Sequence, residues 1–154
     1  MAYADIAAAI KTVIESASGT ANVYDYTRFN SADPEQMKTL FQSGNVINTW
    51  QITRSLANAE FDGTGVCAVD RENEFTINGY YSIDDSAASE KTFQQLVNDV
   101  MDKLNLDANK TLSSNIARFS RPAQLVNFES VMYGSIGCWW CEIKIYPVET
   151  VATA

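Results

Sequence analysis

The stretch Phe75–Ile83, which reads FTINGYYSI, carries the clearest strand pattern in the chain. Side chains on a β-strand point alternately to its two faces, so every second residue shares a face. Apolar and aromatic residues alternate here with mostly polar ones, which predicts a sheet with one buried face. That face would carry Phe75, Ile77, Gly79, Tyr81 and Ile83, and the other face would carry Thr76, Asn78, Tyr80 and Ser82.

A second alternating pattern covers Ser135–Val148, close to the C-terminus. Gly134 and Gly137 favour a tight hairpin turn at its start. The alternation again predicts a strand with one face in the core. One face is expected to carry Trp139, Cys141, Ile143 and Ile145, and the other Cys138, Trp140, Glu142, Lys144 and Tyr146.

The remaining strands are predicted from clusters of β-branched and aromatic residues. Turn residues fill Ala57–Gly65, and the pattern of the predicted strand Val66–Ile83 allows an interruption at Arg71–Asn73. Pro122 favours an edge strand or a bend within the predicted strand Ala117–Tyr133, because proline cannot donate a backbone hydrogen bond. The predicted strands are Val23–Tyr26, Val46–Leu56, Val66–Ile83 and Ala117–Tyr133.

Three helices are predicted, two long and one short. Apolar residues recur at three- and four-residue spacing over Ala4–Ala17 and Ala87–Leu104, which indicates one buried stripe on each helix. The short helix, Ser31–Ser43, has a start signal in Asp33 as the cap and Pro34 in the first helical position.

These elements predict an α+β fold. We expect a mainly antiparallel sheet with the two longer helices packed on one face and an additional short helix, because both long apolar stripes need the sheet as cover. A chain of 154 residues is of ordinary length for one domain. We expect that domain to span residues 1–148, followed by a flexible tail at residues 149–154.

The composition argues against several classes of function. The formal net charge of −8 disfavours nucleic-acid binding, which relies on Lys and Arg. The chain has no histidine, the usual general base and commonest metal ligand. Three cysteines cannot all pair with one another, which favours a reducing compartment. The N-terminus lacks the basic start and apolar stretch of a signal peptide, so we expect folding in a cytoplasm.

Two motifs have the residue types of a reactive site. Cys138-Trp139-Trp140-Cys141 is a Cys-x-x-Cys motif, but within a strand its sulfurs would point to opposite faces, so packing is expected instead of redox or zinc chemistry. Asp84 and Asp85 precede a helix and are interpreted as caps. We therefore expect no enzyme activity and no catalytic, cofactor-binding or metal-binding residues.

Aromatic and basic residues suggest a surface for assembly. Tyr80 and Trp140 fall on the polar faces of their strands, where either a helix covers them or a partner protein contacts them. Arg71, Arg118 and Arg121 could pair with acidic residues on a neighbour and set the register of an assembly. These five residues are the candidate interface.

The order of elements resembles the tail terminator and neck proteins of tailed bacteriophages. The similarity lies in an N-terminal helix, a long strand pair ending in Phe75–Tyr81, a long helix that opens with Ser89–Phe93, and the closing strand Ile136–Val148. It spans roughly residues 1–148. The helix over Asp33–Gly44 is less typical of the family, which leaves open which neck component this is.

The resemblance implies a structural virion protein without catalytic residues. Members of this family form a ring, usually a hexamer, that terminates the tail tube and joins the tail to the head. The implied partners are further copies of the chain, the tail tube protein and a neck or head-completion protein. DNA would pass through the ring without specific binding, and no membrane is implied. Assembly would take place in the cytoplasm of the host bacterium.

Two other functions stay open from the residues alone. A curved sheet and a helix could enclose an apolar pocket, as in a small-ligand binding module. An enzyme using carboxylates and tyrosine would need a buried cluster of acids, and the acids here are scattered. A measurement of the protein's mass in solution distinguishes a small-ligand binding module from a ring, because a binding module can be a monomer or dimer.

Overall fold

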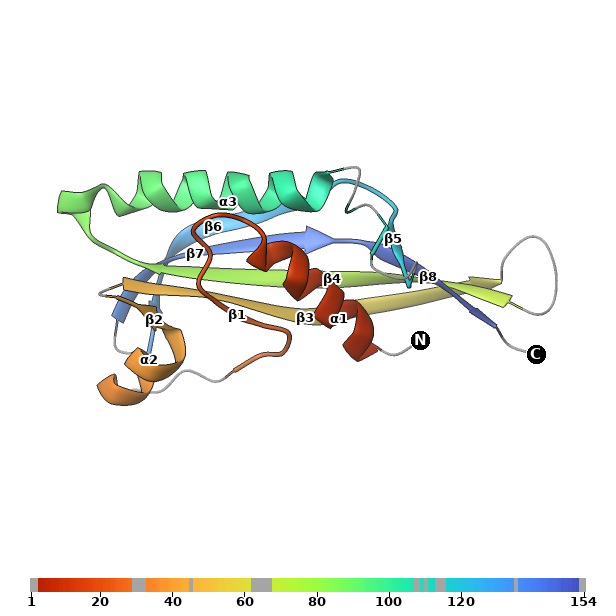
Figure 1. Ribbon diagram of the computed structural model, residues 1–154, viewed down its shortest axis with the longest axis horizontal. Coiled ribbons are helices and arrows are strands. Elements are labelled where there is room, and N and C mark those ends of the chain that lie inside the picture. The colour runs from red at the N-terminus through yellow and green to blue at the C-terminus, as the bar shows by residue number, and fades with distance from the viewer. Residues whose placement is uncertain are drawn as a thin grey trace.

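The computed structural model describes residues 3–28, 33–44, 46–61, 68–106, 109, 111–112, 116–134 and 136–152. These residues form an α+β fold around an eight-stranded, mostly antiparallel sheet (Figure 1). The elements are α1 (Tyr3–Glu15), β1 (Asn22–Tyr24), α2 (Pro34–Phe41), β2 (Gln42–Ser43), β3 (Val46–Phe61), β4 (Ala68–Ser82), the 3-10 turn η1 (Asp85–Ala87), α3 (Ser89–Asn105), β5 (Arg118–Phe119), β6 (Gln124–Tyr133), β7 (Ile136–Ile145) and β8 (Pro147–Ala152).

The main path of the sheet runs β1-β3-β4-β7-β6. β1 is parallel to β3, and every other neighbouring pair is antiparallel. β6 lies at one border of the path, in keeping with the edge position that Pro122 indicates, since Pro122 stands just before the strand. The predicted strand Val23–Tyr26 is shorter in the structure, because β1 ends at Tyr24.

The hairpin of β3 and β4 is longer than the sequence predicts. β4 continues without a break through Arg71–Asn73, and β3 continues to Phe61, so the predicted interruption and the start of the predicted turn at Ala57 are both wrong. The rest of that turn, residues 62–67, lies outside the described residues. β8 pairs with β4 from Ala68 to Glu72 and supplies hydrogen bonds to a polar stretch that resembles a loop. This part of β4 in turn pairs with β3 as far as Phe61.

The C-terminal strand is divided in two. β7 ends at Ile145 and pairs with β4 up to Phe75, whereas β8 begins at Pro147 and pairs with a different part of β4. The expected flexible tail at residues 149–154 is therefore wrong for 149–152, which belong to β8; residues 153 and 154 lie outside the described part of the chain. Glu149, at 2% exposure, is among the most buried charged residues.

One face of the sheet carries the main core, as the alternation predicts. We call it the core face; on β4 and β7 it holds Phe75, Ile77, Cys141 and Ile143, all fully buried. The same apolar cluster includes Ile10 of α1 and Phe93 of α3. Figure 1 shows α3 running beside the long strands and the β3–β4 hairpin reaching past its end.

The opposite face, which we call the outer face, is covered in part by α2. Phe41 of α2 packs with Ile47, Tyr133 and Cys138 in a second, smaller cluster. The predicted start of this helix is confirmed, because the Asp33 side chain accepts a hydrogen bond from the backbone N–H of Glu35 at 3.1 Å. The helix is shorter than the predicted Ser31–Ser43, since Gln42 and Ser43 pair with β3 as β2.

The long helix α3 is tied to the sheet at its N-terminus. The Asp84 side chain caps η1 by accepting from the backbone N–H of Ala87 at 3.3 Å, so it caps this turn and not the long helix as predicted. The N-cap of α3 is Ala88, which makes no side-chain cap hydrogen bond. Ser89, the first residue of α3, accepts from the backbone N–H of Asp84 at 2.7 Å and from the indole N–H of Trp139 at 3.1 Å. These contacts fix α3 against β7.

Gly79 lets Trp50 pack flat on the centre of the sheet, and replacing it with alanine is expected to destabilise the fold. A Cβ at this position would lie 2.6 Å from Cζ3 of Trp50 and 2.8 Å from Sγ of Cys141, both fully buried. We expect Gly79→Ala to lose about 1–3 kcal/mol, measured by urea denaturation. Gly137→Ala is the matched control, because its Cβ would come no nearer than 3.7 Å to another side chain; equal losses would contradict this packing.

Candidate functional site

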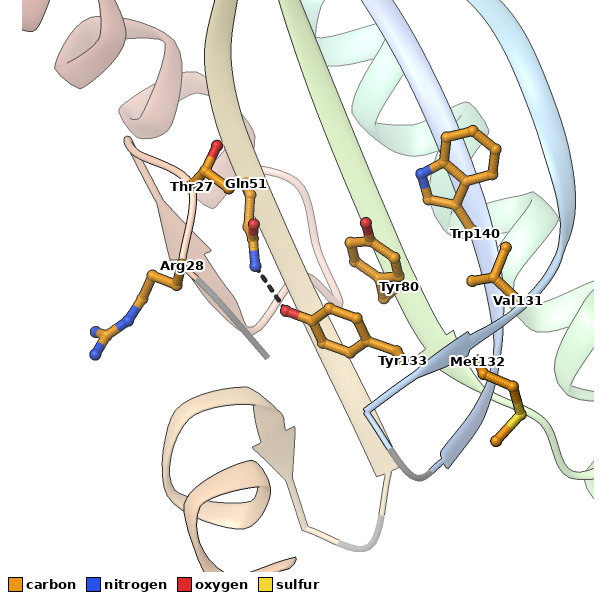
Figure 2. Close-up of a pocket in the computed structure, with 8 residues that line it drawn as sticks. All are labelled: Thr27, Arg28, Gln51, Tyr80, Val131, Met132, Tyr133 and Trp140. Atoms are coloured by element: carbon orange, nitrogen blue, oxygen red, sulfur yellow. Dashed lines mark hydrogen bonds between the residues drawn. The ribbon is translucent and has the colours of Figure 1, made fainter. Parts of the chain in front are cut away.

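The outer face has a hollow of about 340 Å³ beside α2 (Figure 2). It lies over β3, β4, β6 and β7, so residues far apart in the sequence meet there. Its volume is near the lower end of the range for small-molecule sites. The lining residues are Thr27, Arg28, Gln51, Tyr80, Val131, Met132, Tyr133 and Trp140.

Two stacked tyrosines form the floor of the hollow. The rings of Tyr80 and Tyr133 lie 4.1 Å apart at an angle of 14°. The side-chain amide of Gln51 donates a hydrogen bond to the Tyr133 hydroxyl at 2.7 Å, and the pair is buried. Burial raises the pKa of Tyr133 above its usual range, helped by the neighbouring Tyr80, and burial likewise raises the pKa of Tyr80. Both phenols are therefore neutral at physiological pH.

Trp140 stands beside Tyr80 as its direct partner in the register of β4 and β7. Its indole N–H donates to the side-chain oxygen of Asn78 at 3.0 Å, which fixes the ring on the outer face. The structure therefore brings together the two aromatic candidates. α1 and α3 bury their apolar residues in the core-face cluster, whereas Tyr80 packs in the smaller cluster that contains Phe41 of α2. The short helix α2 therefore covers part of Tyr80.

The hollow includes residues that the sequence pattern does not reveal. Arg28 lies at the rim, with its guanidinium 4.8 Å from the ring centre of Tyr24. Gln51 and Tyr133 come from separate strands, β3 and β6, and meet only through the sheet order. Met132 beside them is 68% exposed. Their position at the end of a predicted strand is the one sequence signal for Tyr133 and Met132.

The three candidate arginines lie elsewhere, around β8. Arg71 and Tyr80 are nine positions apart on β4, a distance of about 30 Å along the strand. Arg71 forms an ion pair of 2.8 Å with Glu149, and Arg121 pairs with Glu72 at 3.5 Å. Arg118 in β5 is exposed and pairs through its backbone with Val148. Two of the three arginines are thus already matched with acids of the same chain.

The cysteine motif has the geometry expected for packing. Cys138 lies in the cluster with α2 and Cys141 in the main core, so the two sulfurs are on opposite faces of β7. Burial raises the pKa of each thiol to about 12. Both are therefore protonated thiols near neutral pH.

Within the described ranges, no group of three or more Cys, Asp or Glu residues is placed to hold a metal ion. None of the described helices is both long and apolar enough to cross a membrane. In comparisons with known proteins, neither a family model nor a curated protein matches the chain.

Arg71 is expected to act in stability rather than in partner binding. Glu149 is 2% exposed, and its second oxygen, Oε2, finds no hydrogen-bond partner in the described structure. Removing Arg71 would leave the buried carboxylate of Glu149 unpaired, so Arg71→Gln should lower the free energy of unfolding by about 2 kcal/mol, measured by denaturation. The loss should be smaller than for a wholly buried pair, because Arg71 is 35% exposed. The double variant with Glu149→Gln should recover part of this loss.

The control for this experiment is Arg121→Gln. Its ion pair with Glu72 is about half exposed on both sides, so its loss should cost less than about 1 kcal/mol. Equal effects of the two arginine substitutions, or no recovery in the double variant, would contradict a structural role for the Arg71–Glu149 pair.

The buried thiols are expected to be unreactive in the native protein. A rise in pKa from 9.0 to about 12 lowers the thiolate fraction at pH 8 about a thousandfold. In a Cys67→Ser background, a thiol reagent should label Cys138 and Cys141 only as the protein unfolds. Because the unfolded thiols ionise first, folding stability should also fall as the pH rises from about 9 towards about 12. Rapid labelling at pH 8 without unfolding would refute this.

Proposed function

We propose that this protein is a structural subunit of a bacteriophage tail, and that it forms a closed homo-oligomeric ring. The ring, a hexamer by resemblance to tail terminator and neck proteins, would end the tail tube and join the tail to the head. The order of elements that carries the resemblance recurs in the fold: α1, the long β3–β4 pair, α3 and the closing strand β7.

The observation that carries the proposal is the shape of the β3–β4 hairpin. The half of the hairpin farther from the helices, which we call the arm, reaches past the end of α3 (Figure 1). It consists of Ser55–Glu60 on β3 and Ala68–Glu72 on β4. Ser55–Glu60 are all exposed, so this arm buries little core of its own. A long arm held mainly by β8 suits contact with another subunit, because assembly supplies the cover that the single chain does not.

The arrangement of the helices supports a free outer face. We propose that α1 and α3 together cover the core face, which leaves the middle of the outer face open for a partner. Tyr80 and Trp140 stand there, and such rings are common anchors of protein interfaces. In this proposal the tail tube protein, or the neck protein on the other side of the ring, contacts the surface around Trp140.

A small-ligand binding module is the second candidate. The hollow formed by Tyr80, Tyr133 and Trp140 favours it, since aromatic side chains with a few polar groups line many such sites. The two functions differ in the state of the protein. A binding module can work as a monomer or dimer, whereas a tail terminator has to assemble into a larger ring.

The proposal predicts that the purified protein forms a ring, alone at high concentration or when tail tube protein is present. Light scattering should give a mass several times that of one chain. Trp140→Thr should weaken tube binding at least about tenfold, since interface tryptophans often dominate binding, while circular dichroism stays near wild type. Leu106→Thr, an exposed apolar residue after α3, is the control and should bind normally.

A wild-type protein that stays monomeric under both conditions and does not bind the tube would refute the tail function. Saturable binding of a small molecule in the aromatic hollow by that monomer would then favour the second candidate.

A further inference from the structure

Two long stretches at the borders of the sheet have an unpaired side in the described structure, one on β3 and one on β6. β1 and β2 cover β3 only at Thr49–Gln51 and Val46–Ile47, so the described structure leaves the outer side of β3 unpaired from Ile52 to Phe61. At the other border of the sheet, no described strand pairs with the outer side of β6. Each edge therefore presents a row of backbone N–H and C=O groups that another chain can pair with.

Exposed apolar side chains gather on these same two strands. Of the seven large hydrophobic residues that the described structure leaves exposed, four are on β3 or β6. They are Leu56 at 50%, Leu125 at 39%, Val126 at 43% and Met132 at 68%. Apolar residues gathered along a free edge indicate a surface that is covered in the working protein.

Neither edge is well protected against pairing. Charged residues and prolines usually block free edges, yet β6 has Glu129 as its single charge and the open part of β3 has only Arg54 and Glu60. Each strand has one irregularity, near Ser55 on β3 and near Val126 on β6. Leu56–Phe61 and Asn127–Tyr133 remain regular on either side of these bulges, and both are long enough to pair.

The directions of the two edges fit each other. Because β3-β4, β4-β7 and β7-β6 are all antiparallel, β6 runs opposite to β3 in the same chain. A second copy turned about an axis along the strands therefore presents its β3 antiparallel to β6 of the first. In one chain the register places Gln124 level with Thr53, so pairing with the open part of β3 also needs a shift of roughly eight residues along the strands. This contact is head to tail, so each new copy leaves one free edge of each kind, and the series closes into a ring when the strands are inclined to the ring axis, as in a barrel, so that the shift is absorbed.

The charges agree with this direction. In an antiparallel pair the start of β6, with the exposed Arg118 shortly before it, lies towards the end of β3, where Glu60 stands. The same direction brings Glu129 towards the part of β3 that carries Arg54. Opposite charges therefore meet at both ends, whereas a parallel pair would separate Glu60 from Arg118.

We propose that β6 of one copy pairs antiparallel with the open part of β3 of the next copy, so that the sheets of the ring form one continuous sheet. This inference rests on the proposed ring and identifies the contact that builds it. The partner at both edges is a second copy of this chain.

Disulfide cross-linking between two variants tests the pairing, each with one introduced cysteine besides the buried Cys138 and Cys141. Asn58→Cys on β3 and Asn127→Cys or Glu129→Cys on β6 place thiols on the outer face, where opposed residues of an antiparallel pair come close enough for a disulfide. Ser130→Cys is the matched control, because it is exposed on the same strand but points to the core face. All variants carry Cys67→Ser.

Under mild oxidation, mixing Asn58→Cys with a β6 outer-face variant should give a covalent dimer, and the Ser130→Cys mixture should give at least about tenfold less. A chain with both cysteines of a productive pair should give a ladder that stops at the number of subunits in the ring. Leu56→Lys should weaken assembly at least about tenfold, and Leu106→Lys should not.

The outcomes separate the two proposals. A protein that assembles and binds the tube, but gives no cross-link between β3 and any outer-face position of β6, overturns the edge contact and leaves the ring in place. Cross-linking as efficient from Ser130 as from the outer-face positions overturns it as well. A protein that stays monomeric with and without tube protein overturns both.

Discussion

The contact between Trp50 and Gly79 fixes the centre of the molecule. Trp50 is fully buried on β3, its ring lies 5.7 Å from that of Phe93 in α3, and its N–H donates to the side chain of Asn48 at 3.1 Å. It can lie there because Gly79, opposite it on β4, has no side chain. The core face of β3, β4 and β7 lies under α3. The register of β4 and β7 then places Tyr80 and Trp140 side by side on the outer face.

Much of this fold can be predicted from local sequence. The alternation of β4 and β7, the stripes of α1 and α3 and the capping role of Asp33 depend on residues close together in the chain, where periodicity and capping are strong signals. The arm of the β3–β4 hairpin could not be predicted in this way. Its polar residues form strands because β8 pairs with them and because Arg71 meets Glu149, and both contacts join parts of the chain that are far apart.

The same limit applies to the candidate surface. Tyr80 and Trp140 could be assigned to one face because each strand alternates on its own, but their neighbours Gln51 and Tyr133 depend on the order of the strands. The arginines were grouped by charge alone, and the fold separates them from the aromatic residues by most of the length of β4. The molecule thus has two surfaces at different places, an aromatic hollow beside α2 and a long arm with an open edge. A ring that also binds an outside partner needs two such surfaces, one for its own subunits and one for the partner.

The position of β8 links the arm to the order in which the chain is made. β8 pairs with β4 at residues roughly eighty positions earlier, so the third strand of the arm is missing until synthesis has passed β8. A chain that ends before β8 can fold its centre around Trp50 but lacks the strand and the Glu149 carboxylate that support the arm. Synthesis of β8 is therefore a condition for a complete arm, and an assembly that depends on the arm selects against copies truncated before it.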